Sequence, residues 1–133
     1  MRWGTIRWVG TGIHSSSPTS ARSCSIVSAS ATGSTDIYSA GTLVSPDGTL
    51  QRLGHQDVEI ATLSHSKSPR SGTLYPARTR LNLELVLEVA PLLADQELDV
   101  SVRYWEGAIA VRGTAQGVPV NGRGYLELTG YAE

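Results

Sequence analysis

The sequence contains no phenylalanine, one methionine and a single cysteine, Cys24, among its 133 residues. A lone cysteine cannot form a disulfide within the chain, and it excludes a zinc site made of several cysteines. Without phenylalanine, a core must be built mainly from Leu, Val, Ile and Ala, with a few Trp and Tyr side chains. We therefore expect an aliphatic core, and we expect neither a metal nor another cofactor.

Charge and long apolar runs are also scarce. The formal net charge is −1, so no cationic excess favours nucleic acid or an anionic membrane as a partner. No apolar run is long enough for a membrane-spanning helix. The first residues carry Arg2 and Arg7 but lack the apolar stretch of a secretory signal, which leaves the compartment unknown. The length allows one domain with a modest core.

Residues 1–35 differ from the rest in being rich in serine. Nine serines lie between positions 15 and 34, and residues 15–20 show no hydrophobic period. Such a composition buries too little apolar surface to offset the entropy of ordering, so we predict an irregular N-terminal segment. A second interpretation is that residues 1–32 are an out-of-frame translation of a segment that encodes strands. The codons possible for residues 9–27, read in a shifted frame, are compatible with a strand-like sequence.

From residue 36 onward, apolar and polar residues alternate with the period of β-strands, and no helical period of useful length occurs. Ser45-Pro46-Asp47-Gly48 predicts a turn, residues 64–76 predict a polar loop, and residues 115–117 predict another turn. Glu106-Gly107 predicts a tight corner. The expected strands run over residues 38–44, 49–53, 58–62, 81–89, 98–104, 108–113 and 119–131.

These strands predict an all-β, antiparallel domain over residues 36–133. Short turns between strands with alternating faces are typical of a barrel or a sandwich. A closed barrel that holds a small ligand needs about eight strands. The chain has one or two fewer, so we expect an incomplete barrel whose open edges promote self-association or aggregation.

Five sequence blocks stand in an order that resembles a known family. They are Gly33-Ser34-Thr35-Asp36 with Tyr38-Ser39-Ala40-Gly41-Thr42-Leu43, Ser68-Pro69-Arg70-Ser71-Gly72 with Tyr75-Pro76, Pro91-Leu92-Leu93 with Asp95-Gln96-Glu97-Leu98, Tyr104-Trp105-Glu106-Gly107-Ala108, and Gly122-Arg123-Gly124-Tyr125-Leu126-Glu127-Leu128-Thr129-Gly130-Tyr131. The last two blocks are specific together, because chance rarely repeats that order of aromatic, acidic and glycine residues. From about residue 34 to the end, the chain resembles AttH-type proteins and hydroxyneurosporene synthase (CrtC, carotenoid 1,2-hydratase).

This resemblance implies a lipocalin-like barrel that is normally the second of two packed domains, so a missing N-terminal lipocalin-like domain is an expected partner. It also implies a hydro-lyase activity, the addition of water to a carotenoid double bond, or a related transformation of an apolar polyene, isoprenoid or lipid. Family members are often exported or membrane-associated. The alternative is a non-catalytic lipid-binding or scaffolding module. The chain departs from the family in its Ser-rich start, and at Ser66 and Thr79, where the family often has Trp.

Tyr104-Trp105-Glu106 is the best candidate site. A buried, neutral carboxyl group can protonate an alkene, and an adjacent Trp can stack on a polyene. The structural alternative is that Trp105 fills the barrel end while Glu106 anchors a turn or pairs with Arg123. The predicted catalytic residue is Glu106, and the predicted ligand-binding residues are Tyr104, Trp105, Tyr125, Glu127 and Tyr75.

Other candidate groups carry weaker signals. Asp95 and Glu97 are predicted to be solvated or to cap a loop, and the three histidines lack the spacing of metal ligands. A geometric criterion separates an enzyme from a binding module, namely whether the polar-face residues converge inside one cavity. These residues are Glu84, Arg103, Glu106, Arg123 and Glu127.

Overall fold

The computed structural model describes residues 4–14, 22–30, 40–83 and 85–131. Within these ranges the chain forms strands, turns and bends, with no helix that is long and apolar enough to cross a membrane. The strands are β1 (Gly4–His14), β2 (Arg22–Ser30), β3 (Ala40–Val44), β4 (Leu50–Leu53), β5 (Glu59–Thr62), β6 (His65–Lys67), β7 (Leu74–Pro76), β8 (Thr79–Asn82), β9 (Leu85–Pro91), β10 (Glu97–Asp99), β11 (Arg103–Ala115) and β12 (Val118–Thr129).

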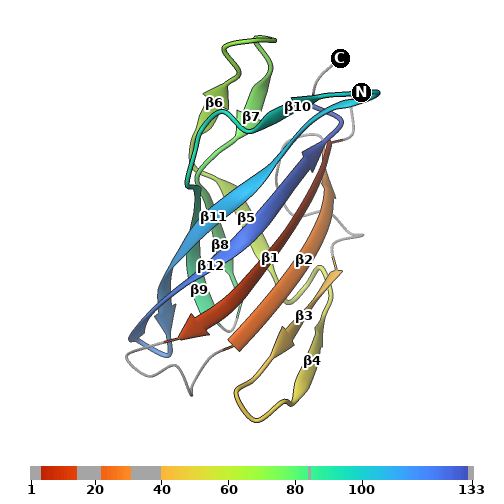
Figure 1. Ribbon diagram of the computed structural model, residues 1–133. Helices are drawn as coiled ribbons and strands as arrows, with labels where there is room; N and C mark the ends of the chain where they lie inside the picture. Colours follow the sequence, from red (N-terminus) through yellow and green to blue (C-terminus); the bar gives the residue numbers. More distant parts are fainter. Residues whose placement is uncertain (1–3, 15–21, 31–39, 84, 132–133) are drawn as a thin grey trace.

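One large antiparallel sheet dominates the molecule, in the order β4-β3-β2-β1-β12-β11-β9-β8-β5. β10 pairs with the first residues of β11, and β6 pairs with β7 as a separate hairpin. Figure 1 shows β2, β1, β12 and β11 side by side across the front, with β9, β8 and β5 curling behind them. The sheet does not close, because β4 and β5 are its two ends. The predicted all-β, antiparallel, incomplete barrel is confirmed.

The core lies on the inner face of this curled sheet. Along β11 the buried and less buried residues alternate from Trp105 to Val111, and Leu126 and Leu128 of β12 join them. Side chains from both ends of the sheet, such as Leu53 of β4 and Ile60 of β5, belong to the same cluster. The core is aliphatic as expected, and its buried aromatic residues among those described are Tyr75 and Trp105.

The expectation of an irregular N-terminal segment is wrong for β1 and β2. β1 pairs with β12 over Thr5 to His14 and with β2 on its other side, and β2 pairs with β3. Backbone ladders on both sides supply hydrogen bonds that do not depend on side-chain hydrophobicity, so tertiary context overrides a serine-rich composition. The predicted boundary at residue 35 therefore falls between two paired strands. Residues 15–21 and 31–39 lie outside the described ranges, and the out-of-frame origin stays a prediction.

The predicted continuous strand over residues 81–89 is wrong, because the chain turns back between Asn82 and Leu85. Asn82 lies opposite Val86 and Leu81 lies opposite Leu87, and the Leu83 amide donates to the Leu85 carbonyl oxygen. Leucines continue at every second position across the turn, so a period-2 pattern in the sequence cannot reveal it. Glu84 lies outside the described residues.

The predicted strand over residues 98–104 and the corner at Glu106-Gly107 are also wrong. β10 ends at Asp99, the chain turns through residues 100–102, and β11 continues through Glu106 and Gly107 to Ala115. A Cβ atom at Gly107 would overlap the amide group of Gln96. A side chain at this position would therefore displace the end of the Gln96 side chain, and Gly107 does not mark a corner.

Two turns are confirmed, and the predicted polar loop is partly a hairpin. The Gly48 amide donates to the Ser45 carbonyl oxygen, and Gly48 has a φ of 87°. Gln116 and Gly117, with φ values of 51° and 81°, join β11 to β12 in a two-residue turn of the kind that matches strand twist. Residues 64–76 contain the hairpin β6–β7, which has too few apolar residues for its strands to show a hydrophobic period.

Candidate functional sites

The predicted site residues divide between the two faces of β11. Successive residues of a strand point to opposite faces, so Tyr104 and Glu106 lie on the outer face while Trp105 lies on the inner one. Trp105 is 3% exposed, and its indole Nε1 donates to the Ala94 carbonyl oxygen at 3.0 Å. This position matches the structural alternative, in which Trp105 fills the end of the barrel. It separates Trp105 from a ligand on the outer face.

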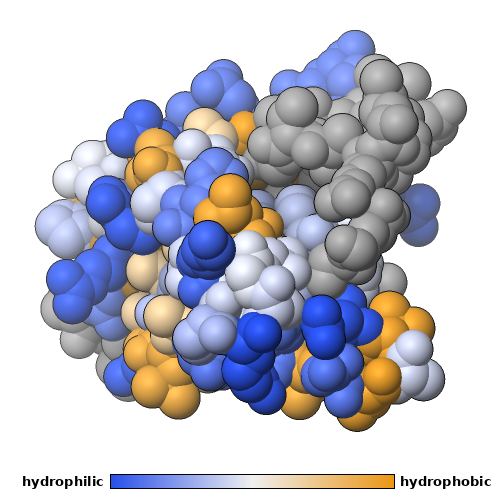
Figure 2. All heavy atoms as spheres, turned by 90° about the horizontal axis from the view of Figure 1, so that it is seen from above, coloured by the Kyte–Doolittle hydropathy of each residue, from blue (hydrophilic) through white to orange (hydrophobic). Residues whose placement is uncertain are grey.

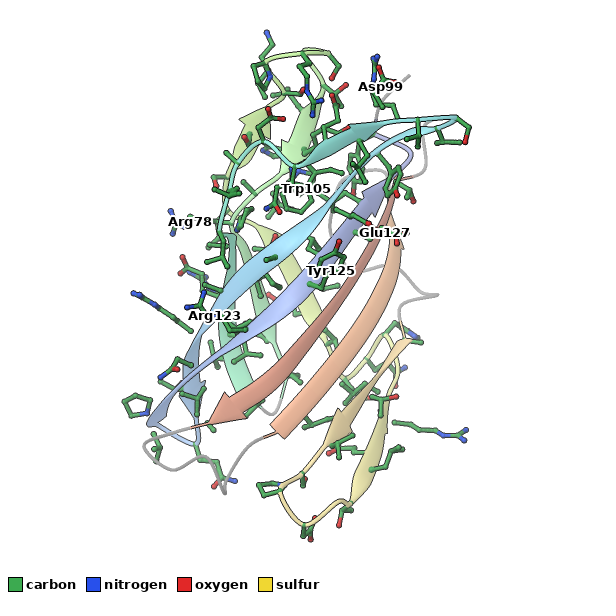
Figure 3. All side chains as sticks on the ribbon, viewed as in Figure 1. Arg78, Asp99, Trp105, Arg123, Tyr125 and Glu127 are labelled. Atoms are coloured by element: carbon green, nitrogen blue, oxygen red, sulfur yellow. The ribbon has the colours of Figure 1, made fainter. Side chains whose placement is uncertain are left out.

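The outer face brings together four of the predicted residues, which we call the Tyr–Glu face: Tyr104, Glu106, Tyr125 and Glu127. Glu106 lies opposite Glu127 in the β11–β12 register, and Ala108 lies opposite Tyr125. The Glu106 carboxyl group lies close enough to Tyr125 to act on the pKa of its phenol. Figure 3 shows Tyr125 and Glu127 following one another along β12.

Partial burial and the neighbouring Glu106 charge raise the pKa of Tyr125 above its usual value. The phenol therefore stays protonated at neutral pH beside Glu106. Glu106 and Glu127 are half-buried, whereas Tyr125 is 49% exposed. The face thus presents two carboxyl groups and two phenols to solvent, an arrangement that can move a proton to or from a molecule lying across β11 and β12.

The polar-face residues do not converge inside one cavity. Arg103 points to solvent and pairs with Asp99 at 3.0 Å, while Arg123 lines a groove on the outer face. Glu106 and Glu127 lie on the Tyr–Glu face, and Glu84 is outside the described residues. By this criterion, the four polar-face residues that the structure describes do not line a common enclosed site.

The sixth predicted residue, Tyr75, belongs to a second cluster that the sequence analysis missed. Its centre is Glu97, which is only 3% exposed. The Glu97 carboxylate accepts hydrogen bonds from Ser68 Oγ at 2.8 Å, Ser71 Oγ at 2.7 Å and Tyr75 Oη at 2.6 Å. The prediction that Glu97 is solvated or caps a loop is therefore wrong. The physical reason is that the β6–β7 hairpin carries three hydroxyl donors over the carboxylate.

The local sequence explains how these donors are held. The Ser68 amide donates to the Thr73 carbonyl oxygen, and the Gly72 amide donates to the Ser68 carbonyl oxygen, which closes the hairpin loop. Arg70 reaches across to the Glu97 carbonyl oxygen and forms an ion pair with Asp95 at 3.3 Å. No pattern in the sequence links these residues, because 29 positions separate Ser68 from Glu97.

The electrostatics of this cluster favour an ionised Glu97. Burial acts to raise the pKa of Glu97, but hydrogen bonds from Tyr75, Ser71 and Ser68, together with the Arg103 charge, lower it below its usual value. Burial and the adjacent Glu97 carboxylate raise the pKa of Tyr75. A carboxylate with three hydroxyl donors has little capacity left for a substrate proton. The cluster therefore serves to fasten the β6–β7 hairpin onto β10.

The hairpin covers one end of the curled sheet. Figure 2 shows this end filled with side chains, with hydrophobic patches between hydrophilic ones. Within the described ranges, no group of three or more His, Cys, Asp or Glu side chains is placed to hold a metal ion. The chemical groups gathered in the described chain are thus the Glu97 cluster and the Tyr–Glu face.

Comparison with known proteins places this architecture in a family. The model of the AttH-like family matches residues 26–131, which is most of the chain and runs from within β2 to the end of β12. The chain belongs to the AttH-like family. The resemblance inferred from the sequence blocks is thereby confirmed at the level of the family.

Two solved structures illustrate the fold of this AttH-like chain. One is a protein of Nitrosomonas europaea described as AttH, with 29% identity and a TM-score of 0.72 over 98% of this chain and 39% of that one. The other is kievitone hydratase from Nectria haematococca, with 19% identity and a TM-score of 0.65 over 95% of this chain and 40% of that one. The chain thus spans about two fifths of each. No curated protein matches it.

Two tyrosines of this AttH-like domain offer a matched test of the Glu97 cluster. The Tyr75 and Tyr131 rings pack with centroids 6.2 Å apart, but the buried Tyr131 hydroxyl has no hydrogen-bond partner among the described residues. We expect Tyr75→Phe to lower the free energy of unfolding by about 2 kcal/mol, because it removes a hydrogen bond to a charged group. Tyr131→Phe removes only an unsatisfied hydroxyl and should be neutral or stabilising. Urea unfolding followed by tryptophan fluorescence measures both.

The denaturant slope serves as the internal control, because an unchanged slope shows that the two variants expose the same surface on unfolding. Burial raises the pKa of Tyr131 to about 12, as expected for a phenol without a charged neighbour. Equal loss of stability in the two variants would contradict the assignment of Tyr75 as a specific donor to Glu97.

Proposed function

We propose that the chain is a lipocalin-like domain of a larger AttH-type protein, and that its Tyr–Glu face takes part in the hydration of a double bond in an apolar polyene or isoprenoid. The observation that carries the proposal is that the β11–β12 register sets Glu106 opposite Glu127 on one face, with Tyr104 and Tyr125 beside them. Kievitone hydratase shares only the fold at 19% identity, so the argument for hydration rests on this face.

Hydration of an alkene needs a proton donor, a water molecule and a proton acceptor. In the proposed reaction, the Glu106 carboxyl group transfers its proton to one alkene carbon, which leaves a cation on the other carbon. Water adds to the cation, and the resulting oxonium ion loses a proton to the Glu106 or Glu127 carboxylate. The proton count is thereby restored, and the tyrosines hold the carboxyl groups in place.

Because Glu106 is half-exposed, the proposed reaction requires that something covers the Tyr–Glu face and excludes water from it. An apolar substrate lying over the face excludes water, and exclusion of water favours a protonated carboxyl group. The solved relatives are about two and a half times longer than this chain. In a protein of that length, the additional part can also cover the Tyr–Glu face. A missing N-terminal lipocalin-like domain is the partner that we propose for this role.

A second candidate function is a non-catalytic lipid-binding or scaffolding module. It is favoured by one observation, that the polar-face residues do not meet in an enclosed cavity. In this case the domain binds an apolar molecule, or supports another domain, without transferring a proton.

Isotope labelling separates these two functions. The chain is incubated with a detergent-dispersed acyclic carotenoid in H₂¹⁸O, and hydrated product is measured by mass spectrometry. We expect ¹⁸O incorporation by the original chain and its loss, by about a hundredfold or more, in Glu106→Gln, because general acid catalysis contributes rate factors of this size. Glu59→Gln, the same change on an exposed strand residue, is the control and should retain incorporation.

The outcomes are distinct. Incorporation that persists in Glu106→Gln would show that Glu106 is not the acid. Binding of the carotenoid without any incorporation would overturn hydration by this chain and support the non-catalytic module.

A further inference from the structure

The outer face carries a groove at the opposite end of β11 from the Tyr–Glu face. One hollow of about 590 Å³ lies over β8, β9 and β11, and Val86, Ala90 and Ala110 give it apolar walls. A second hollow of about 600 Å³ shares Ala110 with the first and continues over β12 toward Leu92. The two form one groove, because they also share Arg112 and Gly113.

Small residues explain why the sheet is hollowed here. Ala110 and Gly113 of β11 and Ala90 of β9 project little above the backbone, whereas larger side chains flank them. Val86, at 46% exposed, adds apolar surface that no described residue covers. Because neighbouring strands lie about 4.8 Å apart, a groove that crosses β8, β9, β11 and β12 is roughly 14 Å long.

Positive charge in the groove lacks a counter-charge. Arg80 and Arg112 both lie opposite Glu88 in the strand register, but Glu88 forms its ion pair with Arg78 at 2.8 Å. Arg123 lines the adjoining hollow. Among the described residues, none of Arg80, Arg112 and Arg123 has an acidic partner. The described lining of the groove holds three arginines and one glutamate, a net charge of +2, on a chain whose net charge is −1.

We propose that this groove binds an amphipathic monocarboxylate of the fatty-acid class. Arg112 lies where the two hollows meet, and its guanidinium donates paired N–H hydrogen bonds to the carboxylate. Arg80 or Arg123 adds positive charge from either side. The aliphatic chain lies along Val86, Ala90 and Ala110. The volume of each hollow falls within the range of small-molecule sites, and the length of the groove suits an aliphatic chain of about a dozen carbons.

Charge and hydropathy together select this ligand class. A neutral lipid would leave the three arginines without an anion, and a small hydrophilic anion would leave the apolar walls exposed to water. Nucleic acid is disfavoured because no aromatic side chain lines the groove for base stacking. The groove adjoins the Tyr–Glu face on β12, where Arg123 and Tyr125 are two residues apart, but Ala110 near its centre is roughly 13 Å from Glu106 along β11.

Isothermal titration calorimetry with dodecanoate, kept below its micelle concentration, tests the proposal on the full chain. We expect saturable binding by the original chain and an affinity at least about tenfold lower for Arg112→Gln, because the charge-assisted pair is lost. Arg52→Gln, the same change on an exposed residue of β4 outside the groove, is the matched control and should bind as the original chain does.

Two further ligands identify what the groove recognises. Dodecanol, which has the same chain without the charge, should bind at least about tenfold more weakly than dodecanoate. Equal binding of the two ligands, or equal affinity in Arg112→Gln and the original chain, would overturn the proposal. So would tight binding of a hexaglutamate peptide with no binding of dodecanoate, because the groove would then bind an acidic protein segment. These outcomes do not depend on whether Glu106 hydrates a substrate.

Discussion

Replacing Glu97 by glutamine is expected to lower the free energy of unfolding by about 3 kcal/mol, because a buried charged acceptor with three hydroxyl donors is lost. Ser68, Ser71 and Tyr75 all donate to this carboxylate at 2.6 to 2.8 Å. Glutamine keeps the shape but replaces one acceptor oxygen by a donor, which faces hydroxyl groups that were themselves donating. Glu97→Ala should cost more, since all three hydroxyls then lose their acceptor.

The pH dependence of stability gives a second readout of the same change. The pKa of folded Glu97 lies below its ordinary value of 4.5, so the unfolded chain binds more protons in acid. The stability contributed by Glu97 is present above pH 4.5 and is lost as the pH falls through the lower, folded pKa. The original chain should therefore lose this contribution on acidification, whereas Glu97→Gln, which has no carboxyl group to titrate, should show a flatter acid limb.

Glu88→Gln is the matched control for this prediction. Glu88 is a glutamate with a charged partner, Arg78, but the Glu88 and Arg78 side chains are 43% and 54% exposed. Exposed ion pairs contribute less than about 1 kcal/mol, so this variant should unfold at nearly the same urea concentration as the original chain. A Glu97→Gln variant as stable as Glu88→Gln would refute the role of Glu97 in fastening the β6–β7 hairpin.

Much of the fold could be predicted, because alternation of apolar and polar residues is a local property. The turns at Ser45–Gly48 and at Gln116-Gly117 also have local signals, in which proline, aspartate and glycine set the backbone. The hairpin between β8 and β9 could not be predicted, because leucines continue at alternate positions across its turn. β1 and β2 were missed because their strand character comes from pairing within the sheet and has little support in composition.

The two candidate sites likewise differ in how far the sequence predicts them. Glu106, Tyr125 and Glu127 lie within a few residues of glycines and aromatic residues that form recognisable blocks, and the β11–β12 register brings them together. Glu97 depends on Ser68 and Ser71, which reach it only after the chain has folded back across about 26 to 29 positions. A single sequence contains no signal for such a contact.

Gly113 yields the other prediction with a large effect, because its place in β11 leaves no room for a methyl group. A Cβ atom there would overlap the carbonyl oxygen of Val86 and lie 2.8 Å from the Val86 carbonyl carbon and 2.9 Å from the Leu87 Cα atom. All of these atoms belong to the backbone of β9, which pairs with β11 in the middle of the sheet. Relief of the overlap therefore requires a strand to move, and a change of side-chain rotamer cannot provide it.

We expect Gly113→Ala to lower the free energy of unfolding by about 3 kcal/mol or to prevent folding, as forced overpacking and strand displacement do. Two other glycines separate the possible causes. Gly117 has a φ of 81° and open space around its Cα, so Gly117→Ala should cost only about 1 kcal/mol of backbone strain. Gly54 has neither constraint, because the nearest atom to an added Cβ is Asp57 Oδ2 at 3.6 Å. Gly54→Ala should therefore be nearly neutral.

Urea unfolding of the three alanine variants measures this order. Stability should fall in the order Gly54→Ala, Gly117→Ala, Gly113→Ala. If the Gly113 variant does not fold, its soluble yield and its lost near-ultraviolet circular dichroism serve as the readout against the two folded controls. A folded Gly113→Ala protein as stable as Gly54→Ala would mean that β9 and β11 lie farther apart at this position. The register that pairs Gly113 with Leu87, and with it the floor of the arginine-lined groove, would then be wrong.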